Sequence, residues 1–198
     1  MEEPNNLRQF KILLVGDSSV GKTSIMSRYA SNSFPENYQT SVGVDYRIKE
    51  LKRKKHKTMI QILDTGGQDR FRSVAKSFFR EVNGIFIIFD LNDIDTFTGL
   101  NYWVEEIRNT VNDSKVIILG NKSDLKQEVS EEEINKFKEE KNIDIYKVSA
   151  KQNKNIKEAF EKMIHLIRNN PDEDIESFSL DISKHASKHK NKRKKRFC

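Results

Sequence analysis

The chain has 198 residues, of which 35% are hydrophobic and 33% are charged, and its formal net charge is +6. This length suits one α/β domain with a buried core and a tail, and no apolar run approaches the roughly 20 residues of a membrane-spanning helix. The single cysteine, Cys198, excludes an internal disulfide and fits a reducing compartment. The first residues predict neither a secretory signal nor a myristoyl group, because they lack a basic and apolar stretch and a glycine at position 2.

The positive charge is concentrated at the end of the chain. Residues 184–198 contain eight Lys or Arg and no acidic residue, which leaves residues 1–183 with a net charge of −2 (6 − 8). The basic balance is therefore a property of the tail, and it does not support general nucleic-acid binding. We expect no nucleic-acid partner.

Apolar runs typical of buried strands alternate along the chain with amphipathic segments. We expect strands at residues 10–15, 44–51, 58–63, 84–89, 115–119 and 143–148. We expect helices at residues 22–30, 72–80, 96–111, 131–139 and 156–167. Strands that are apolar throughout and separated by helices indicate an α/β fold with a mostly parallel six-stranded sheet and helices on both faces. In such sheets ligands bind at the carboxyl ends of the strands.

The texture of the sequence predicts three parts. Residues 1–9 form a flexible N-terminus, residues 10–168 one domain, and residues 169–198 a tail that is disordered by itself. Asn169-Asn170-Pro171 stops the last helix, residues 172–183 are acidic and polar, and residues 184–198 are basic.

The strongest motif is the run Gly16-Asp17-Ser18-Ser19-Val20-Gly21-Lys22-Thr23, which matches G-x-x-x-x-G-K-[ST] between a predicted strand and a predicted helix. In such a loop the backbone amides surround phosphate oxygens, the lysine contacts the β- and γ-phosphates, and the hydroxyl binds Mg²⁺. The residues expected to contact nucleotide here are Ser18, Ser19, Val20, Gly21, Lys22, Thr23 and Ser24.

A second motif, Asn121-Lys122-Ser123-Asp124, directly follows the apolar run at 115–119. The carboxylate of Asp124 can accept two hydrogen bonds, from the guanine N1 and from the exocyclic amine. Adenine offers no such donor pair and would leave a desolvated carboxylate unpaired, at a cost on the order of 1–3 kcal/mol or more. The motif therefore favours GTP or GDP over ATP.

With these motifs, residues 10–168 resemble the small GTPases of the Ras superfamily, and the Rab subfamily most of all. The resemblance implies a P-loop NTPase G domain. It also implies that Ser149-Ala150-Lys151 forms a further guanine loop, in which the Ala150 amide meets the guanine O6. Lys122 and Lys151 would lie along the base and the ribose, and Phe34 against the face of the guanine.

The resemblance extends to the residues that sense the γ-phosphate. In Asp64-Thr65-Gly66-Gly67-Gln68, Asp64 would hold Mg²⁺ through water and the Gly67 amide would reach the γ-phosphate. Gln68 would be the catalytic residue, because phosphoryl transfer is catalysed mainly by positioning the attacking water and stabilising charge.

Residues 38–46 correspond to the first of the two switch segments, the parts of a Rab protein that respond to the γ-phosphate, and they depart from the usual Rab sequence. Ser41 aligns with the usual Mg²⁺-binding threonine, so the expected Mg²⁺ ligands are Thr23, Ser41 and Asp64, and Tyr38 would cover the phosphates. In the second switch segment, Gly66 stands where Rab proteins usually have an alanine. Leu63 replaces a tryptophan and Phe78-Phe79 a tyrosine pair on the usual effector surface, so the identity of the partners does not carry over.

The tail ends in a basic run followed by Cys198, which resembles the prenylated ends of Rab proteins and is not a C-a-a-X sequence. A prenyl group with nearby basic residues would give reversible docking on a membrane. A solvated basic tail or a nuclear-localisation patch with an incidental cysteine is the alternative. We therefore expect a cytoplasmic protein that binds reversibly to the cytosolic face of an endomembrane or of the plasma membrane.

The sequence thus predicts a GTP/GDP switch in membrane trafficking. Its switch regions would bind effectors, an exchange factor and a GTPase-activating protein. Without an arginine finger, hydrolysis should be slow, of order 10⁻⁴ s⁻¹ as in unassisted relatives. The alternatives are a Ras-branch signalling GTPase, a nucleotide-binding scaffold with little or no hydrolysis, and a P-loop ATPase or kinase.

Overall fold

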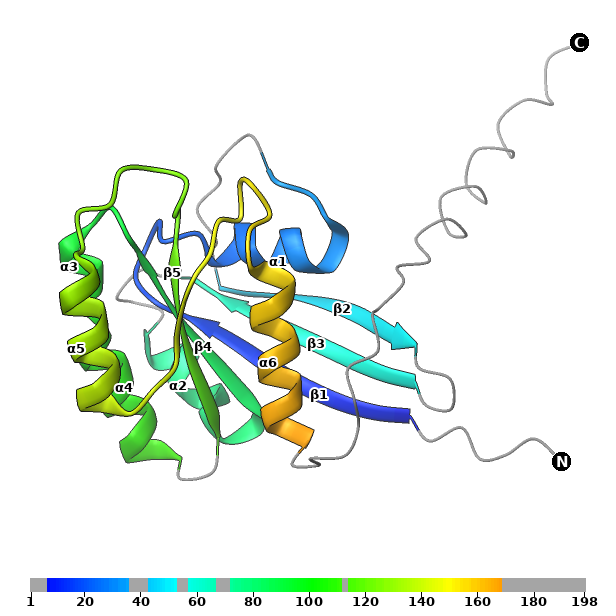
Figure 1. Cartoon of the computed structure of the whole chain (residues 1–198). Helices are drawn as coiled ribbons and strands as arrows, with labels where there is room; N and C mark the ends of the chain where they lie inside the picture. The colour runs from blue at the N-terminus through cyan, green and yellow to red at the C-terminus, as the bar shows by residue number, and fades with distance from the viewer. Residues whose placement is uncertain (1–6, 36–42, 53–56, 67–71, 112–113, 169–198) are drawn as a thin grey trace, which may run out of the picture.

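The computed structural model describes residues 7–35, 43–52, 57–66, 72–111 and 114–168 (Figure 1). Its strands are β1 (Leu7–Val15), β2 (Val44–Lys52), β3 (Lys57–Thr65), β4 (Gly84–Asp90), β5 (Lys115–Asn121) and β6 (Ile145–Lys147). Its helices are α1 (Lys22–Ser31), α2 (Arg72–Phe78), α3 (Ile94–Thr98), α4 (Leu100–Thr110), α5 (Glu131–Lys141) and α6 (Ile156–Arg168), with one 3₁₀ turn, η2 (Phe79–Glu81).

The six strands form one sheet in the order β2-β3-β1-β4-β5-β6. All neighbouring strands are parallel except β2, which pairs antiparallel with β3. The predicted mostly parallel sheet with helices on both faces is therefore confirmed. Since β1 and β4 lie in the middle of the sheet, the loops that follow them open onto the centre of one edge.

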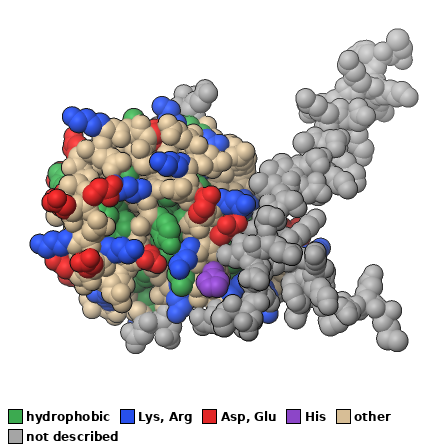
Figure 2. Space-filling model, viewed as in Figure 1, with side chains coloured by type: hydrophobic (Ala, Val, Ile, Leu, Met, Phe, Trp, Pro, Cys, Tyr) green, Lys and Arg blue, Asp and Glu red, His purple; other side chains and the backbone are tan. Residues whose placement is uncertain are grey.

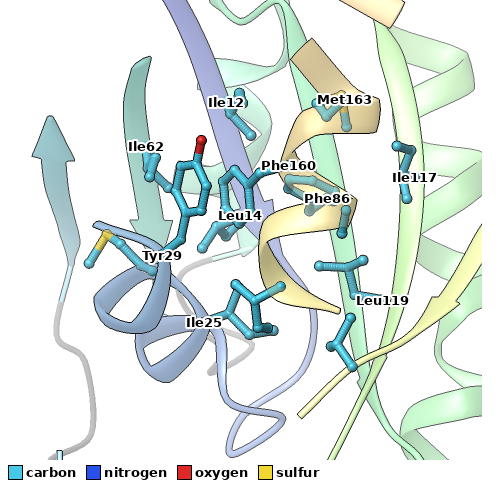
Figure 3. Packing of buried hydrophobic residues seen from close by; sticks show 14 of the residues in the cluster. Ile12, Leu14, Ile25, Tyr29, Ile62, Phe86, Ile117, Leu119, Phe160 and Met163 are labelled. Atoms are coloured by element: carbon cyan, nitrogen blue, oxygen red, sulfur yellow. The ribbon is translucent and has the colours of Figure 1, made fainter. Parts of the chain in front are cut away.

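Each face of the sheet is covered by helices and has its own hydrophobic core. Alternate residues of β1 divide between them: Ile12 and Leu14 face α1 and α6, whereas Leu13 and Val15 face α2, α4 and α5. Figure 3 shows the first core, in which residues from β1, β3, β4 and β5 pack against residues of α1 and α6. Because both faces are covered, β4 is buried along its whole length, which explains its continuously apolar sequence.

The largest differences between prediction and structure concern four elements. The strand predicted at 10–15 already begins at Leu7, so residues 7–9, expected to belong to a flexible N-terminus, pair with β3 instead. The helix predicted at 96–111 is two helices, α3 and α4, which meet at Gly99. The helix predicted at 72–80 is α-helical only to Phe78 and ends in the 3₁₀ turn. The strand predicted at 143–148 pairs only over Ile145–Lys147, because β6 is an edge strand with β5 as its neighbour. Residues 53–56, between β2 and β3, lie outside the described residues.

The surface formed by α5 and α6 is mixed in character. Figure 2 shows Lys, Arg, Asp and Glu side chains interspersed around a smaller number of exposed hydrophobic ones. Among the helices that the structure describes, none is both long enough and apolar enough to cross a membrane.

Candidate nucleotide-binding site

The predicted binding residues come together at one edge of the sheet. The phosphate loop (residues 16–23) follows β1, Asp64 lies at the end of β3, and the loops at 121–124 and 149–151 follow β5 and β6. These four strands point in the same direction, so their carboxyl ends meet at this edge. The arrangement is the one expected for a ligand site in an open parallel sheet.

The phosphate loop depends on its two glycines. Gly16 has a φ of +140° and Gly21 a φ of +96°, both in the region that favours glycine. A Cβ atom on Gly16 would overlap the carbonyl oxygen of Ile88 on β4, and one on Gly21 would overlap the amide nitrogen of Asn121. The loop therefore packs directly against β4 and against Asn121, and there is no room for a side chain at either glycine. The loops at 121–124 and 149–151 are called the base loops below, because they are predicted to hold the guanine base.

Lys22 folds back over the phosphate loop. Its ammonium group donates hydrogen bonds to the carbonyl oxygens of Gly16, at 2.9 Å, and Asp17, at 2.6 Å, and its side chain is 5% exposed. Burial lowers the pKa of Lys22 to about 8, although the carboxylates of Asp64 and Asp17 partly oppose the shift. A cation held in this way at the mouth of the loop is suited to binding phosphate oxygens.

Thr23 and Asp64 meet beside Lys22. The Thr23 hydroxyl donates a hydrogen bond to the Asp64 carboxylate, which is fully buried at the end of β3. A hydroxyl and a carboxylate in contact are oxygen donors of the kind that Mg²⁺ uses together with substrate phosphates. The residues present therefore fit a magnesium site, and Lys22 supplies the neighbouring positive charge.

Asn121 joins the phosphate loop to the last base loop. Its amide nitrogen donates to the carbonyl of Val20, at 2.9 Å, and its side-chain oxygen accepts from the amide of Ala150, at 3.2 Å. The side chain is 2% exposed, so both bonds are shielded from water. Asn121 therefore fixes the distance between the part of the site predicted to hold phosphates and the part predicted to hold the base.

Lys122 is held by Asp90, the last residue of β4, and by Asn92 just after it. Its ammonium group lies 2.6 Å from the carboxylate of Asp90, and its carbonyl accepts from the side chain of Asn92 at 3.2 Å. Burial alone would raise the pKa of Asp90, but hydrogen bonds from Lys122 and Asn92 outweigh it and lower that pKa. Neither Asp90 nor Asn92 belonged to the predicted site. Asp90 directly follows the apolar run at 84–89, as Asp64 follows the run at 58–63, and that position is the only signal that could have identified it.

The carboxylate of Asp124 and the loop at 149–151 are also oriented by neighbours. Asp124 accepts a hydrogen bond from the hydroxyl of Ser149 at 2.6 Å. From α1, Arg28 donates to the carbonyls of Ala150, at 2.8 Å, and Lys151, at 3.2 Å. Arg28 is another residue that the sequence analysis missed, because nothing in its neighbourhood along the chain marks it.

Comparison with known proteins decides the family. The Ras family model matches residues 11–169. GTP-binding protein Rab-3D from Rattus norvegicus is 35% identical over 173 residues, which cover 86% of this chain and 79% of the relative. GTP-binding protein YPTM1 from Zea mays is 36% identical over 162 residues, 80% and 78% of the two chains. GTP-binding protein ypt1 from Schizosaccharomyces pombe is 36% identical over 162 residues, 80% of each chain.

The chain belongs to the Ras family. Within that family it is a Rab-like small GTPase, which confirms the resemblance drawn from its motifs.

The structure of this Rab-like GTPase covers most of the predicted site. The described residues include the phosphate loop, Ser24, Phe34, Asp64 and both base loops. The predicted residues Tyr38, Ser41, Gly67, Gln68 and Cys198 lie outside the described residues. Phe34 is 37% exposed, with the guanidinium of Arg28 5.9 Å from its ring centre.

In this Rab-like GTPase, Leu63 and Phe79, which align with residues of the usual Rab effector surface, are not exposed. Leu63 and Phe79 are 7% and 0% exposed, because both pack in the core beneath α2 and α4. By contrast, Tyr46 and Ile48 on β2 are 59% and 50% exposed, and Val74 on α2 is 36% exposed. Among the described residues of this region, the exposed hydrophobic side chains are therefore those of Tyr46, Ile48 and Val74.

Proposed function

We propose that this Rab-like GTPase is a GTP/GDP switch whose nucleotide site is the carboxyl edge of the sheet. In this proposal the phosphate loop holds the phosphates, Asp124 accepts hydrogen bonds from the guanine N1 and amine, and Lys122 and Lys151 lie along the base and ribose. The Ala150 amide contacts the guanine O6, and Phe34 covers the base. In this proposal the binding domain begins at Leu7, where β1 starts, rather than at the predicted residue 10, and ends at residue 168, and residues 169–198 form its tail.

The observation that carries the proposal is the bridge made by Asn121. It links Val20 in the phosphate loop to Ala150 in the base loop through two shielded hydrogen bonds. Such a bridge holds the two loops at a fixed separation, which is what a single ligand with a base and phosphates requires. The Ala150 amide, at 3.2 Å from Asn121, can share its hydrogen with a guanine oxygen.

Mg²⁺ is part of the proposal. Thr23, Asp64 and Ser41 would hold it, directly or through water, and the bound ion would supply positive charge that neutralises the phosphates during transfer. Lys22, buried next to Thr23 and within reach of the loop carbonyls, adds a second positive charge at the same place.

We assign hydrolysis to a water molecule oriented by Gln68, with the Gly67 amide on the γ-phosphate. Two arginines near the site are engaged elsewhere: Arg28 binds carbonyls of the last base loop, and Arg72 lies against the side chain of Asp17. A GTPase-activating protein would therefore supply the missing positive charge, and unassisted turnover would be slow.

We further propose that the protein works in membrane trafficking. The exposed side chains of Tyr46, Ile48 and Val74 are available to effectors, exchange factors and activating proteins next to the switch segments. The basic tail and a prenyl group on Cys198 would hold the active protein reversibly on the cytosolic face of an endomembrane or of the plasma membrane.

Nucleotide competition tests the base site. Unlabelled GTP or GDP should displace a fluorescent GDP, and ATP should fail at concentrations at least about 100-fold higher, because adenine leaves Asp124 unpaired. Asp124→Asn presents one donor and one acceptor and should shift the preference from guanine to xanthine, which has a carbonyl in place of the amine. Equal competition by ATP and GTP with the unmodified protein would overturn the assignment.

Single-turnover hydrolysis of γ-labelled GTP tests the catalytic step. Gln68→Leu keeps the volume of the side chain and removes its polar atoms, so phosphate release should slow at least about tenfold while GTP still binds. Equal and negligible release by both proteins would instead favour a nucleotide-binding scaffold.

A further inference from the structure

Asp17 connects the phosphate loop to α2 and α4, which cover the face of the sheet that contains Leu13 and Val15. One carboxylate oxygen, Oδ1, accepts from Nη2 of Arg72, at 3.2 Å, and from the indole nitrogen of Trp103, at 3.2 Å. Arg72 is the first residue of α2, and Trp103 lies in α4. One side chain therefore holds the phosphate loop, the start of α2 and the middle of α4 together.

The side chain of Arg72 is held in one orientation by its neighbours. The guanidinium of Arg72 lies 4.6 Å from the ring centre of Tyr102 and 5.7 Å from that of Trp103, so it sits between two aromatic rings and a carboxylate. The other carboxylate oxygen lies 2.6 Å from the position that a Cβ atom on Gly99 would occupy. The glycine at the junction of α3 and α4 thus allows the carboxylate to approach this closely.

The backbone of Asp17 takes part in the phosphate site at the same time. Its carbonyl oxygen accepts a hydrogen bond from the ammonium group of Lys22 at 2.6 Å. The position of this carbonyl depends on where the side chain of the same residue is anchored. A displacement of α2 that pulls on Arg72 is therefore transmitted through Asp17 to the loop that surrounds Lys22.

We propose that Asp17 and Arg72 are a positioning pair that couples α2 to the phosphate loop, so that breaking their contact loosens the loop and speeds nucleotide release. This inference rests on the proposed function, because it concerns nucleotide held in that loop. It makes α2 the place from which a bound protein can open the phosphate site without touching nucleotide.

The same helix offers a matched control. Lys76, one turn after Arg72, forms an ion pair with Glu106 of α4 and lies 5.8 Å from the ring centre of Tyr102. This pair also fastens α2 to α4, but the structure gives it no contact with the phosphate loop. Arg72→Gln and Lys76→Gln each remove one positive charge from α2 and one link to α4. Only the first removes the link to Asp17.

The experiment measures release of a fluorescent GDP analogue from the full chain with Mg²⁺ present and excess unlabelled GDP. We expect Arg72→Gln to speed release about tenfold and Lys76→Gln to change it less than twofold, with melting temperatures of the two variants alike. Asp17→Asn should resemble Arg72→Gln, and the double variant should release no faster than either single one. Arg72→Lys, which keeps the charge but loses the planar fork, should restore only part of the slow release.

Trp103 gives a second, optical readout, because it is the only tryptophan in the chain. Its emission should change at the same rate as GDP leaves the unmodified protein. In Asp17→Ala, which removes the acceptor of the indole N–H, that change should disappear.

Equal acceleration by Arg72→Gln and Lys76→Gln would mean that the contact only fastens α2 to α4, and no acceleration by either would mean that α2 is not coupled to the loop. Both results overturn the inference while leaving the proposed function intact. If the unmodified protein fails to bind the GDP analogue, the proposed function itself fails.

Discussion

The phosphate loop and the two base loops are held in place by different means. Residues 16–23 depend chiefly on close packing of their backbone, with glycines where β4 and Asn121 leave no space for a Cβ atom. The loops at 121–124 and 149–151 are held by side chains from other elements, among them Arg28 and Asp90. Adding a single methyl group to a loop of the first kind should therefore cause a large loss of folding stability. Removing one side chain that holds a loop of the second kind should cost only the free energy of its hydrogen bonds.

The largest effect should come from adding a methyl group to the phosphate loop. Gly16→Ala should lower the free energy of unfolding by about 3 kcal/mol or more, because the new Cβ meets the carbonyl of Ile88 at a positive φ. Urea denaturation measures this loss. Gly43→Ala is the matched control, since Gly43 has a φ of +85° but its Cβ would meet nothing within 4 Å. It should cost only the conformational strain, about 1–2 kcal/mol. Equal losses would show that contact with β4 is unimportant.

An intermediate effect should follow from removing one of the side chains that hold the base loops. Asn121→Ala leaves the carbonyl of Val20 and the amide of Ala150 without their partner in a buried place, which should cost about 2–3 kcal/mol. The same urea assay applies. Asn92→Ala removes bonds to Asp90 and Lys122 in a more exposed position and should cost about 1 kcal/mol. A larger loss for Asn92 than for Asn121 would contradict the bridging role of Asn121.

The smallest effect should be a gain in stability. Ser19 has a φ of +64°, a conformation that glycine adopts without strain. Ser19→Gly should raise the free energy of unfolding by at most about 1 kcal/mol, because relief of strain is partly offset by the greater freedom of glycine in the unfolded chain. Asn32→Gly should gain nothing, because asparagine tolerates its φ of +52° better and because its side-chain oxygen accepts hydrogen bonds from Arg28 and Asn153. No gain, or a loss, for Ser19→Gly would show that the serine side chain contributes more than the strain costs.

The same contrast explains what the sequence could predict. The phosphate loop was predictable because its constraints are local: the glycines, Lys22 and Thr23 lie within one short run between a strand and a helix. The parallel sheet was predictable for a similar reason, since continuous apolar runs such as β4 are typical of strands buried on both faces.

The residues that hold the base loops were not predictable in this way. Arg28, Asp90 and Asn92 reach the loops only after the strands have been assembled side by side, and their own neighbours along the chain carry no motif. The break between α3 and α4 was missed because the apolar pattern of residues 96–111 continues through Gly99. A glycine is needed at this position because the carboxylate of Asp17, which lies far away in the sequence, approaches it closely.

The stacking of Tyr29 on Phe160 joins the first helix to the last. Their rings lie 3.7 Å apart and nearly parallel, in the core shown in Figure 3. The helix that begins with Lys22 and Thr23 therefore lacks one of its packing partners until the end of the domain has been made. We therefore expect the phosphate loop, which is synthesised early, to become rigid only late in the synthesis of the domain. A nascent chain should therefore capture nucleotide only once α6 has emerged from the exit tunnel.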